Sequence, residues 1–448
     1  MSPDAGNGDL VRRLRREVAE QLSARAAEFE ALGRPAMDEA DRRELGRSLI
    51  DEALERHQQR QLALGRALMD PSAEDEVAAA VHAALFGAGR LEPLLADPNI
   101  ENININGYDR VWLTYADGTK VEGPPIADSD DELVELIRLM AARLGLNERR
   151  FDAGSPRLNL RLPDGSRLSA IMGVSTRPAM SIRRHRFTKV YLDDMVRLGA
   201  IDDGLAAFLH AAVLARKNIV VSGGTNAGKT TLLRALANVI PAGERLVTIE
   251  KSLELGLHEM GDLHPDVVAL EAREANAEGE GEVTMAELVQ HGLRMDPSRV
   301  IVGEVLGDEI LSMLNAMSQG NDGSMCTIHA TSSEYTFSRI ATYALQSSER
   351  LPVEATAQLL AGSIHFVVFI GQRDLRAAGG PHMRFVSSVR EVLDADGATV
   401  ISNEVFRPGH DGRAVPGAPV RCVDELAVHG YEPAWHSTNL HDLSWGAR

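Results

Sequence analysis

The order of apolar and polar positions predicts two charged helices at the start of the chain. Apolar residues recur there at the spacing of one helix face, as at Leu14, Val18 and Leu22. Gly33 and Pro35 interrupt this pattern, because glycine and proline are the residues that most often end a helix. We therefore expect residues 1–73 to form a charged helical segment.

The region 74–189 predicts a small α+β domain. Helical patterns and alternating apolar and polar stretches follow one another there, separated by turn residues. We expect helices over residues 76–86 and 131–144, and two β-hairpins whose strands cover residues 100–105, 111–115, 158–162 and 167–171. Because a hairpin pairs its strands antiparallel, the pattern predicts an antiparallel sheet.

From residue 190 to residue 370, short apolar runs alternate with helical patterns. We expect strands over residues 218–222, 246–249, 300–302 and 325–328, and helices over residues 230–239, 284–295 and 310–318. This alternation predicts an α/β fold with a mostly parallel sheet that helices cover. Residues 371–448 then form a tail with strand-like runs such as 385–392.

Composition and charge narrow the class of protein. The chain has 448 residues, and its 47 Lys and Arg against 65 Asp and Glu give a formal net charge of −18. So acidic a surface repels polyphosphate, which argues against nucleic acid as a partner. The two cysteines, Cys326 and Cys422, are too few for a disulfide framework or a four-cysteine zinc site. So few cysteines fit a reducing cytosol, and we expect a cytoplasmic protein. No apolar run reaches the roughly eighteen residues of a membrane span, so we expect no membrane-spanning segment.

A glycine-rich loop carries the strongest functional signal. Residues 223–230 match the P-loop pattern G-x-x-x-x-G-K-[ST] between a predicted strand and a predicted helix. Glycines let backbone N–H groups turn towards phosphates, Lys229 would meet the β- and γ-phosphates, and the Thr230 hydroxyl would ligate Mg²⁺. We therefore predict that ATP is bound by Gly223, Gly224, Thr225, Asn226, Ala227, Gly228, Lys229, Thr230 and Thr231.

Two further polar side chains lie at the ends of predicted strands. Glu304 follows the strand over residues 300–302, at the end where α/β sheets bind their ligands. It is a candidate general base for the water that attacks ATP, and a surface carboxylate is the alternative. His329 ends the strand over residues 325–328. It could sense the γ-phosphate or bridge to the next subunit, although an isolated histidine more often lies in a core.

The order of the motifs resembles that of the secretion traffic ATPases, which drive type II secretion, type IV pili and type IV secretion. The stretches that carry the resemblance are the P-loop, residues 248–255, residues 294–304 and residues 320–330. The family calls them the Walker A, acidic, Walker B and His boxes. The resemblance covers about residues 85–370. It is closest to the CpaF-like, tight-adherence pilus ATPases, which residues 91–95, 105–107 and 161–167 resemble.

This resemblance implies a RecA-like motor domain over residues 190–370, preceded by a sensory-like α+β domain, and a ring of six subunits. In the family, the acidic box and the P-loop hold Mg²⁺, and arginines near the end of the first domain reach the nucleotide. Carried over to this chain, the metal residues are Thr230, Glu250 and Glu254, the arginines are Arg183, Arg184 and Arg186, and the catalytic residues are Lys229, Glu250, Glu304 and His329.

One position departs from the family's acidic box. An aspartate usually follows the glutamate that Glu250 matches, and this chain has Lys251 there. A lysine that faced the site would weaken the attraction for Mg²⁺. Successive side chains of a strand point to opposite faces, so we expect Lys251 to face away from Glu250.

The sequence and the resemblance together predict a cytoplasmic, hexameric ATPase at the inner face of the cell membrane. It would power the assembly or export of pilin-like subunits through an inner-membrane platform protein. One alternative is a conjugative or type IV secretion ATPase, and another is a nucleotide-gated scaffold with little turnover. The charge of −18 and the lack of aromatic–basic runs argue against a DNA translocase.

Overall fold

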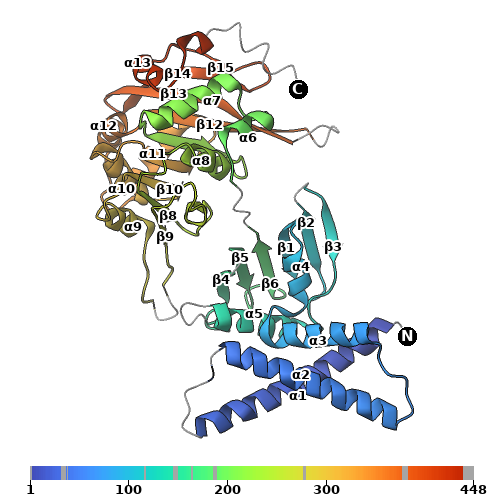
Figure 1. Cartoon of the computed structure of the whole chain (residues 1–448). Coiled ribbons are helices and arrows are strands. Elements are labelled where there is room, and N and C mark those ends of the chain that lie inside the picture. Colours follow the sequence, from blue (N-terminus) through green and yellow to red (C-terminus); the bar gives the residue numbers. More distant parts are fainter. Residues whose placement is uncertain are drawn as a thin grey trace. The chain divides into compact units, whose positions relative to one another are not determined.

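The chain folds into two compact units, Met1–His185 and Arg186–Arg448 (Figure 1). The computed structural model describes residues 3–31, 37, 39–115, 118–144, 150–162, 165–184, 189–275, 279–375 and 382–436. The two units divide between residues 185 and 186, four residues before the boundary that the sequence pattern predicts between residues 189 and 190. Each unit has its own buried apolar clusters.

The first unit begins with three helices, α1 (Pro3–Ala31), α2 (Glu39–Ala63) and α3 (Pro71–Phe86), of which α1 and α2 cross (Figure 1). Their shared core contains Leu14, Val18 and Leu22, at the predicted helical spacing. Gly46 of α2 lies in this core, and a Cβ there would stand 2.2 Å from the Phe86 ring. A glycine at this point therefore lets the ring of α3 pack directly on the backbone of α2.

The rest of the first unit is an antiparallel sheet of six strands in the order β3-β2-β1-β6-β5-β4. The elements are η1 (Gly89–Leu91), α4 (Glu92–Ala96), β1 (Ile100–Asn106), β2 (Val111–Tyr115), β3 (Lys120–Gly123), α5 (Asp130–Leu144), β4 (Arg157–Arg161), β5 (Arg167–Ile171) and β6 (Ala179–Arg183). Alternate residues, such as Ile103 and Ile182, bury one face of the sheet together with Leu133 and Ile137 of α5. The predicted α+β fold is confirmed.

Ion pairs join the first helix to this sheet region. Arg12 pairs with Asp128, and Arg15 Nη1 lies 3.2 Å from Glu132 Oε1. Arg90 Nη2 also reaches Asp128, at 2.9 Å. Part of the basic face of α1 is therefore used within the chain.

The second unit is built on one sheet of nine strands, in the order β15-β14-β13-β12-β7-β11-β10-β8-β9. Its elements are α6 (Leu192–Arg197), α7 (Asp203–Leu214), β7 (Ile219–Gly223), α8 (Lys229–Ala237), β8 (Leu246–Glu250), η2 (Leu257–Glu259), β9 (Val267–Glu271), α9 (Met285–Gly292), β10 (Arg299–Val305), α10 (Glu309–Ser318), β11 (Met325–His329), α11 (Tyr335–Gln346), α12 (Val353–Ser363), β12 (Phe366–Asp374), β13 (His382–Asp396), β14 (Thr399–Pro408), β15 (Ala414–Pro416), α13 (Val423–Ala427) and η4 (Pro433–His436). The strands from β12 across to β9 pair in parallel, as predicted.

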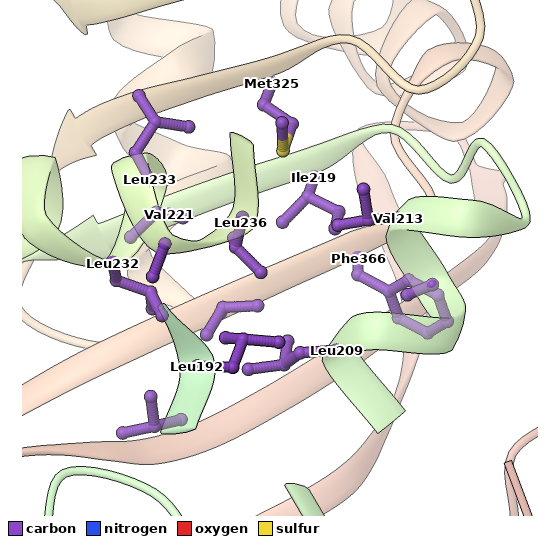
Figure 2. Close-up of a cluster of buried hydrophobic side chains, with 14 of the residues drawn as sticks. Leu192, Leu209, Val213, Ile219, Val221, Leu232, Leu233, Leu236, Met325 and Phe366 are labelled. Carbon is purple, nitrogen blue, oxygen red and sulfur yellow. The ribbon is translucent and has the colours of Figure 1, made fainter. Parts of the chain in front are cut away.

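Helices cover both faces of this sheet. Figure 2 shows α7 and α8 on one face, where Leu209 and Leu236 pack against Ile219 and Phe366 of the strands. Helices α9 to α12 cover the other face, against residues such as Val220. Because both faces are covered, all five residues of β7 are buried. The predicted α/β fold is confirmed.

The last part of the chain continues the same sheet. Strands β13, β14 and β15 pair antiparallel beyond β12. Phe406 of β14 and Tyr431 meet the edge of the Phe208 ring of α7, with centroid distances of 5.1 and 5.4 Å. The described residues 382–436, which the sequence predicts as a separate tail, therefore contribute strands to this sheet and side chains such as Phe406 and Tyr431 to the core of the second unit. In the ranges that the structure describes, no helix combines the length and the apolar character of a membrane span.

Candidate nucleotide site

The P-loop joins β7 to α8 in a conformation that depends on its glycines. Gly228 has φ 96° and Asn226 has φ 58°, both in the left-handed region. A Cβ on Gly223 would stand 2.8 Å from the Ile370 carbonyl oxygen, so β12 passes too close for a side chain. The loop turns its backbone towards the N-terminus of α8, an arrangement that suits an anion.

Lys229, the first residue of α8, lies buried beside this loop. Its side chain is 6% exposed, and its Nζ donates to the Gly224 carbonyl oxygen at 3.1 Å. Burial lowers the pKa of the Lys229 ammonium, while the negative charges of Glu304 and Glu254 oppose that shift. Glu304 Oε1 lies 3.6 Å from Lys229 Nζ.

Glu304 and His329 come together because β10 and β11 are parallel neighbours, so that their carboxyl ends meet at one edge. His329 Nε2 lies 2.8 Å from Glu304 Oε1, and Lys229 Nζ lies 3.1 Å from His329 Nδ1. A neutral ring with its proton on Nε2 satisfies both contacts, since Nδ1 then accepts from the ammonium and Nε2 donates to the carboxylate. Three predicted site residues thus form one connected cluster.

Glu250 has a role in the structure that its motif did not indicate. It ends β8, is 3% exposed, and its Oε1 accepts hydrogen bonds from the backbone N–H groups of Glu254 and Leu255 at 2.8 and 2.9 Å. Arg234 donates to the carbonyl oxygens of the same two residues. The Glu250 side chain also lies against Gly303, where a Cβ would stand 2.8 Å from its Cγ. Glu250 therefore holds the 251–255 loop next to β10.

Lys251 lies on the surface. Its side chain is 60% exposed, and its Nζ lies 4.0 Å from Glu274 Oε1. The buried Glu250 and the exposed Lys251 follow the expected alternation at the end of the strand. The lysine adds no positive charge to the cluster around Lys229.

Two of the predicted arginines, Arg183 and Arg184, lie in the first unit. Arg183, at the end of β6, pairs in register with Arg167 of β5, which pairs with Arg161 of β4. These three form an arginine row on the sheet face opposite the buried Ile182. Arg184 is half-buried and donates to the Asp97 carbonyl oxygen, and Arg186 lies outside the described residues.

Sequence reasoning missed Arg161 and Arg167 as members of this row. The signal was present, because a tight hairpin turn places the residues that flank it opposite each other. Like charges directly opposite across two strands repel.

Comparisons with known proteins agree on one family. A family model described as type II/IV secretion system protein matches residues 85–392. A Mycobacterium tuberculosis protein named for conjugal transfer is 38% identical over 255 residues, which are 55% of this chain and 70% of that protein. The type IV secretion system protein VirB11 of Brucella suis is 31% identical over 308 residues, which are 62% of this chain and 83% of that protein.

Among solved structures, the Legionella pneumophila ATPase DotB is 16% identical, covers 77% of this chain and 84% of its own, and has a TM-score of 0.46. The family model alone spans more than half of this chain. It also includes the P-loop and both strand ends that carry Glu304 and His329. The chain therefore belongs to the type II/IV secretion system protein family and is a secretion ATPase.

Proposed function

We propose that this secretion ATPase is a hexameric motor that powers the assembly or export of pilin-like subunits. The observation that carries its ATPase chemistry is the cluster of Lys229, Glu304 and His329 at the P-loop. Proteins of this family work as oligomers with membrane secretion systems. The resemblance of residues 91–95 and 105–107 to tight-adherence pilus ATPases is our reason for proposing a pilin-like substrate and an inner-membrane platform protein as partner. We place the motor in the cytoplasm, peripherally at the membrane.

In this proposal each residue of the cluster has one task in ATP hydrolysis. The loop N–H groups and Lys229 hold the β- and γ-phosphates, and the hydroxyls of Thr230 and Thr231 lie on the same helix end. Glu304 orients the attacking water or accepts its proton. His329, through its contact with Glu304 Oε1, fixes the direction of that carboxylate. Water attack is thereby aligned with the phosphate that Lys229 holds.

The residues at the site also fit Mg²⁺. The ion prefers oxygen ligands and, in nucleotide sites, takes only one or two from the protein. Thr230 would supply a hydroxyl and Glu254 a carboxylate. Glu250 Oε1 accepts hydrogen bonds from the backbone N–H groups of Glu254 and Leu255, so Glu250 would contribute by holding the loop that carries Glu254. Mg²⁺ supplies neutralisation of the developing phosphate charge.

Replacement of the P-loop lysine tests the proposed function. We expect Lys229→Ala to weaken ATP binding by about ten- to a hundredfold, because charge-assisted hydrogen bonds contribute roughly 1.5–3 kcal/mol. Phosphate release should fall in parallel. Lys251→Ala, which removes an exposed lysine of the same unit, is the matched control and should keep both. Unchanged ATP binding by Lys229→Ala would contradict the proposal that the P-loop binds the phosphates of ATP.

We further propose that Arg183, Arg184 and Arg186 act on the bound triphosphate within a ring of six subunits. Each replacement by alanine should lower ATP hydrolysis by about tenfold or more, since each removes a cation from developing negative charge. The stability of the Arg183 variant should change little, because Arg183 is exposed and exposed arginines contribute little to stability. Light scattering with ATP should show a species near six subunits. A monomer under every nucleotide condition would refute the ring, and full activity in all three variants would refute the arginine role.

One alternative function is favoured by the relatives. Several of them carry names from conjugal transfer or type IV secretion. A motor of that kind would export protein or a DNA–protein complex in place of pilin-like subunits. The neighbouring genes separate the two: pilin genes beside this one support the first function, and relaxase genes support the second.

A further inference from the structure

We infer that Gln372 and Arg384 hold the ribose and base of the bound nucleotide. They lie near the ends of β12 and β13, on the far side of the P-loop from Glu304. The inference rests on the proposed function, because it concerns the same nucleotide. It assigns a positioning and specificity role to two residues outside the four motifs.

Both side chains lie against the P-loop backbone. A Cβ built on Gly224 would stand 3.5 Å from Gln372 Nε2, and one on Gly228 would stand 3.9 Å from Arg384 Cδ. Gln372 and Arg384 are also paired directly across β12 and β13. Directly paired residues share one face of a sheet, so both extend from the face that meets the P-loop.

The strand order decides which end of the nucleotide reaches them. The P-loop strand β7 lies between β11 and β12. Glu304 is the second-last residue of β10 and His329 is the last residue of β11. Both lie on one side of the loop, and hydrolysis needs the γ-phosphate there. A bound nucleoside triphosphate is a linear molecule, so its other end must extend away from that side. The strands in that direction are β12 and β13.

The chemistry of the two residues suits a nucleoside. A glutamine amide both donates and accepts hydrogen bonds, as base edges and ribose hydroxyls do. An arginine guanidinium is planar and stacks on aromatic rings, as well as donating to oxygen. Both side chains are exposed, so their polar ends are open to a ligand.

The neighbouring pair of the same hairpin offers a control. Arg373 pairs with Met383, one residue along each strand. Side chains alternate between the faces of a strand, so Arg373 faces away from the P-loop. Arg373 of β12 carries the same charge as Arg384 of β13, and both side chains are exposed at the same end of this strand pair. A change at Arg373 therefore measures the effect of losing an arginine there without touching the nucleotide.

The test compares ADP with inorganic tripolyphosphate, which has phosphates but no nucleoside. Arg384→Lys keeps the charge and loses the planar group. We expect this variant and Gln372→Ala to weaken ADP binding by about five- to tenfold in titration calorimetry, with tripolyphosphate binding unchanged. The KM for ATP should rise by a similar factor while kcat changes less. Arg373→Lys should bind both ligands as the wild type does.

Two results would overturn the inference. One is unchanged ADP binding in both variants. The other is an equal loss for ADP and tripolyphosphate, which would assign the residues to the phosphates. A wild-type protein that bound neither ligand would instead overturn the proposed function and this inference with it. Lys229→Ala, which should lose both ligands, shows that the assay detects phosphate contacts.

Discussion

Glu304→Gln is expected to lower ATP turnover by about 10²-fold or more, the range for loss of a general base, while ATP binding remains. The amide has the size of the carboxylate, and its oxygen can still accept from His329 Nε2, which lies 2.8 Å from Glu304 Oε1. It cannot take a proton from water. The loss should therefore fall on kcat, which phosphate release measures, and calorimetry with ADP should report near wild-type affinity.

A second carboxylate of the same unit controls for the loss of a negative charge. Glu274 is exposed, with Lys251 Nζ 4.0 Å away, and Glu274→Gln should turn over ATP as the wild type does. Turnover in Glu304→Gln within a fewfold of wild type would show that another group activates the water. In that case the contact with His329 would be structural only.

The largest expected effect on stability comes from Arg299. This arginine is 1% exposed. It donates two hydrogen bonds to the Glu244 carboxylate, from Nε to Oε2 at 2.8 Å and from Nη2 to Oε1 at 2.7 Å. Its Nη1 donates to the Val213 carbonyl oxygen at 2.8 Å. Arg299→Met should lower the free energy of unfolding by about 3 kcal/mol or more, because it leaves a partly buried carboxylate and a buried carbonyl with fewer donors. Urea denaturation followed by circular dichroism measures the loss.

The effect of Arg299→Met should depend on pH. Burial alone would raise the pKa of the Glu244 carboxyl, but hydrogen bonds and charge from Arg299 and Arg216 outweigh it and hold this pKa below its ordinary value of 4.5. A carboxyl of this kind stabilises the fold above its unfolded pKa and loses that contribution as pH falls through the folded pKa. The difference from wild type should thus be full at pH 7 and shrink below about pH 4.5.

An exposed ion pair gives the matched comparison. Lys189 pairs with Asp262, and both side chains are largely open to water. Lys189→Met should cost less than about 1 kcal/mol, as exposed pairs usually do. If Arg299→Met and Lys189→Met lowered the free energy of unfolding equally, burial would not make the Arg299 contacts more stabilising than an exposed ion pair.

The fold class of each unit and the P-loop could be predicted from the sequence, because both depend on residues that lie close together in the chain. Periodicity over a few residues distinguishes the hairpins of the first unit from the strand–helix alternation of the second. The P-loop is a contiguous motif, so its loop geometry follows from Gly228 and its neighbours. The meeting of Glu304 and His329 also follows from a general rule, since both residues lie at the carboxyl ends of neighbouring parallel strands.

The features that sequence reasoning missed depend on strand order and register. Nothing in the periodicity of residues 382–408 says that these strands continue the sheet of the P-loop, so Gln372 and Arg384 could not be placed beside Gly224 and Gly228. The hydrogen bonds that Glu250 accepts from a loop could not be predicted from a sequence motif either. Their donors are backbone N–H groups, which do not depend on the type of residue in the loop. The arginine row could be recognised only from the register in which β4, β5 and β6 pair.

The sheet that runs from β9 to β15 has a practical consequence for anyone who shortens this protein. A fragment that stopped after β12 would contain all four sequence motifs. It would also leave β12 as an unpaired edge strand, whose exposed backbone N–H and C=O groups can pair with another copy of the fragment. Phe208 would also lose the rings of Phe406 and Tyr431 that pack on it. Minimal catalytic fragments and fusion partners should therefore be joined beyond the last strand, never between β12 and β13.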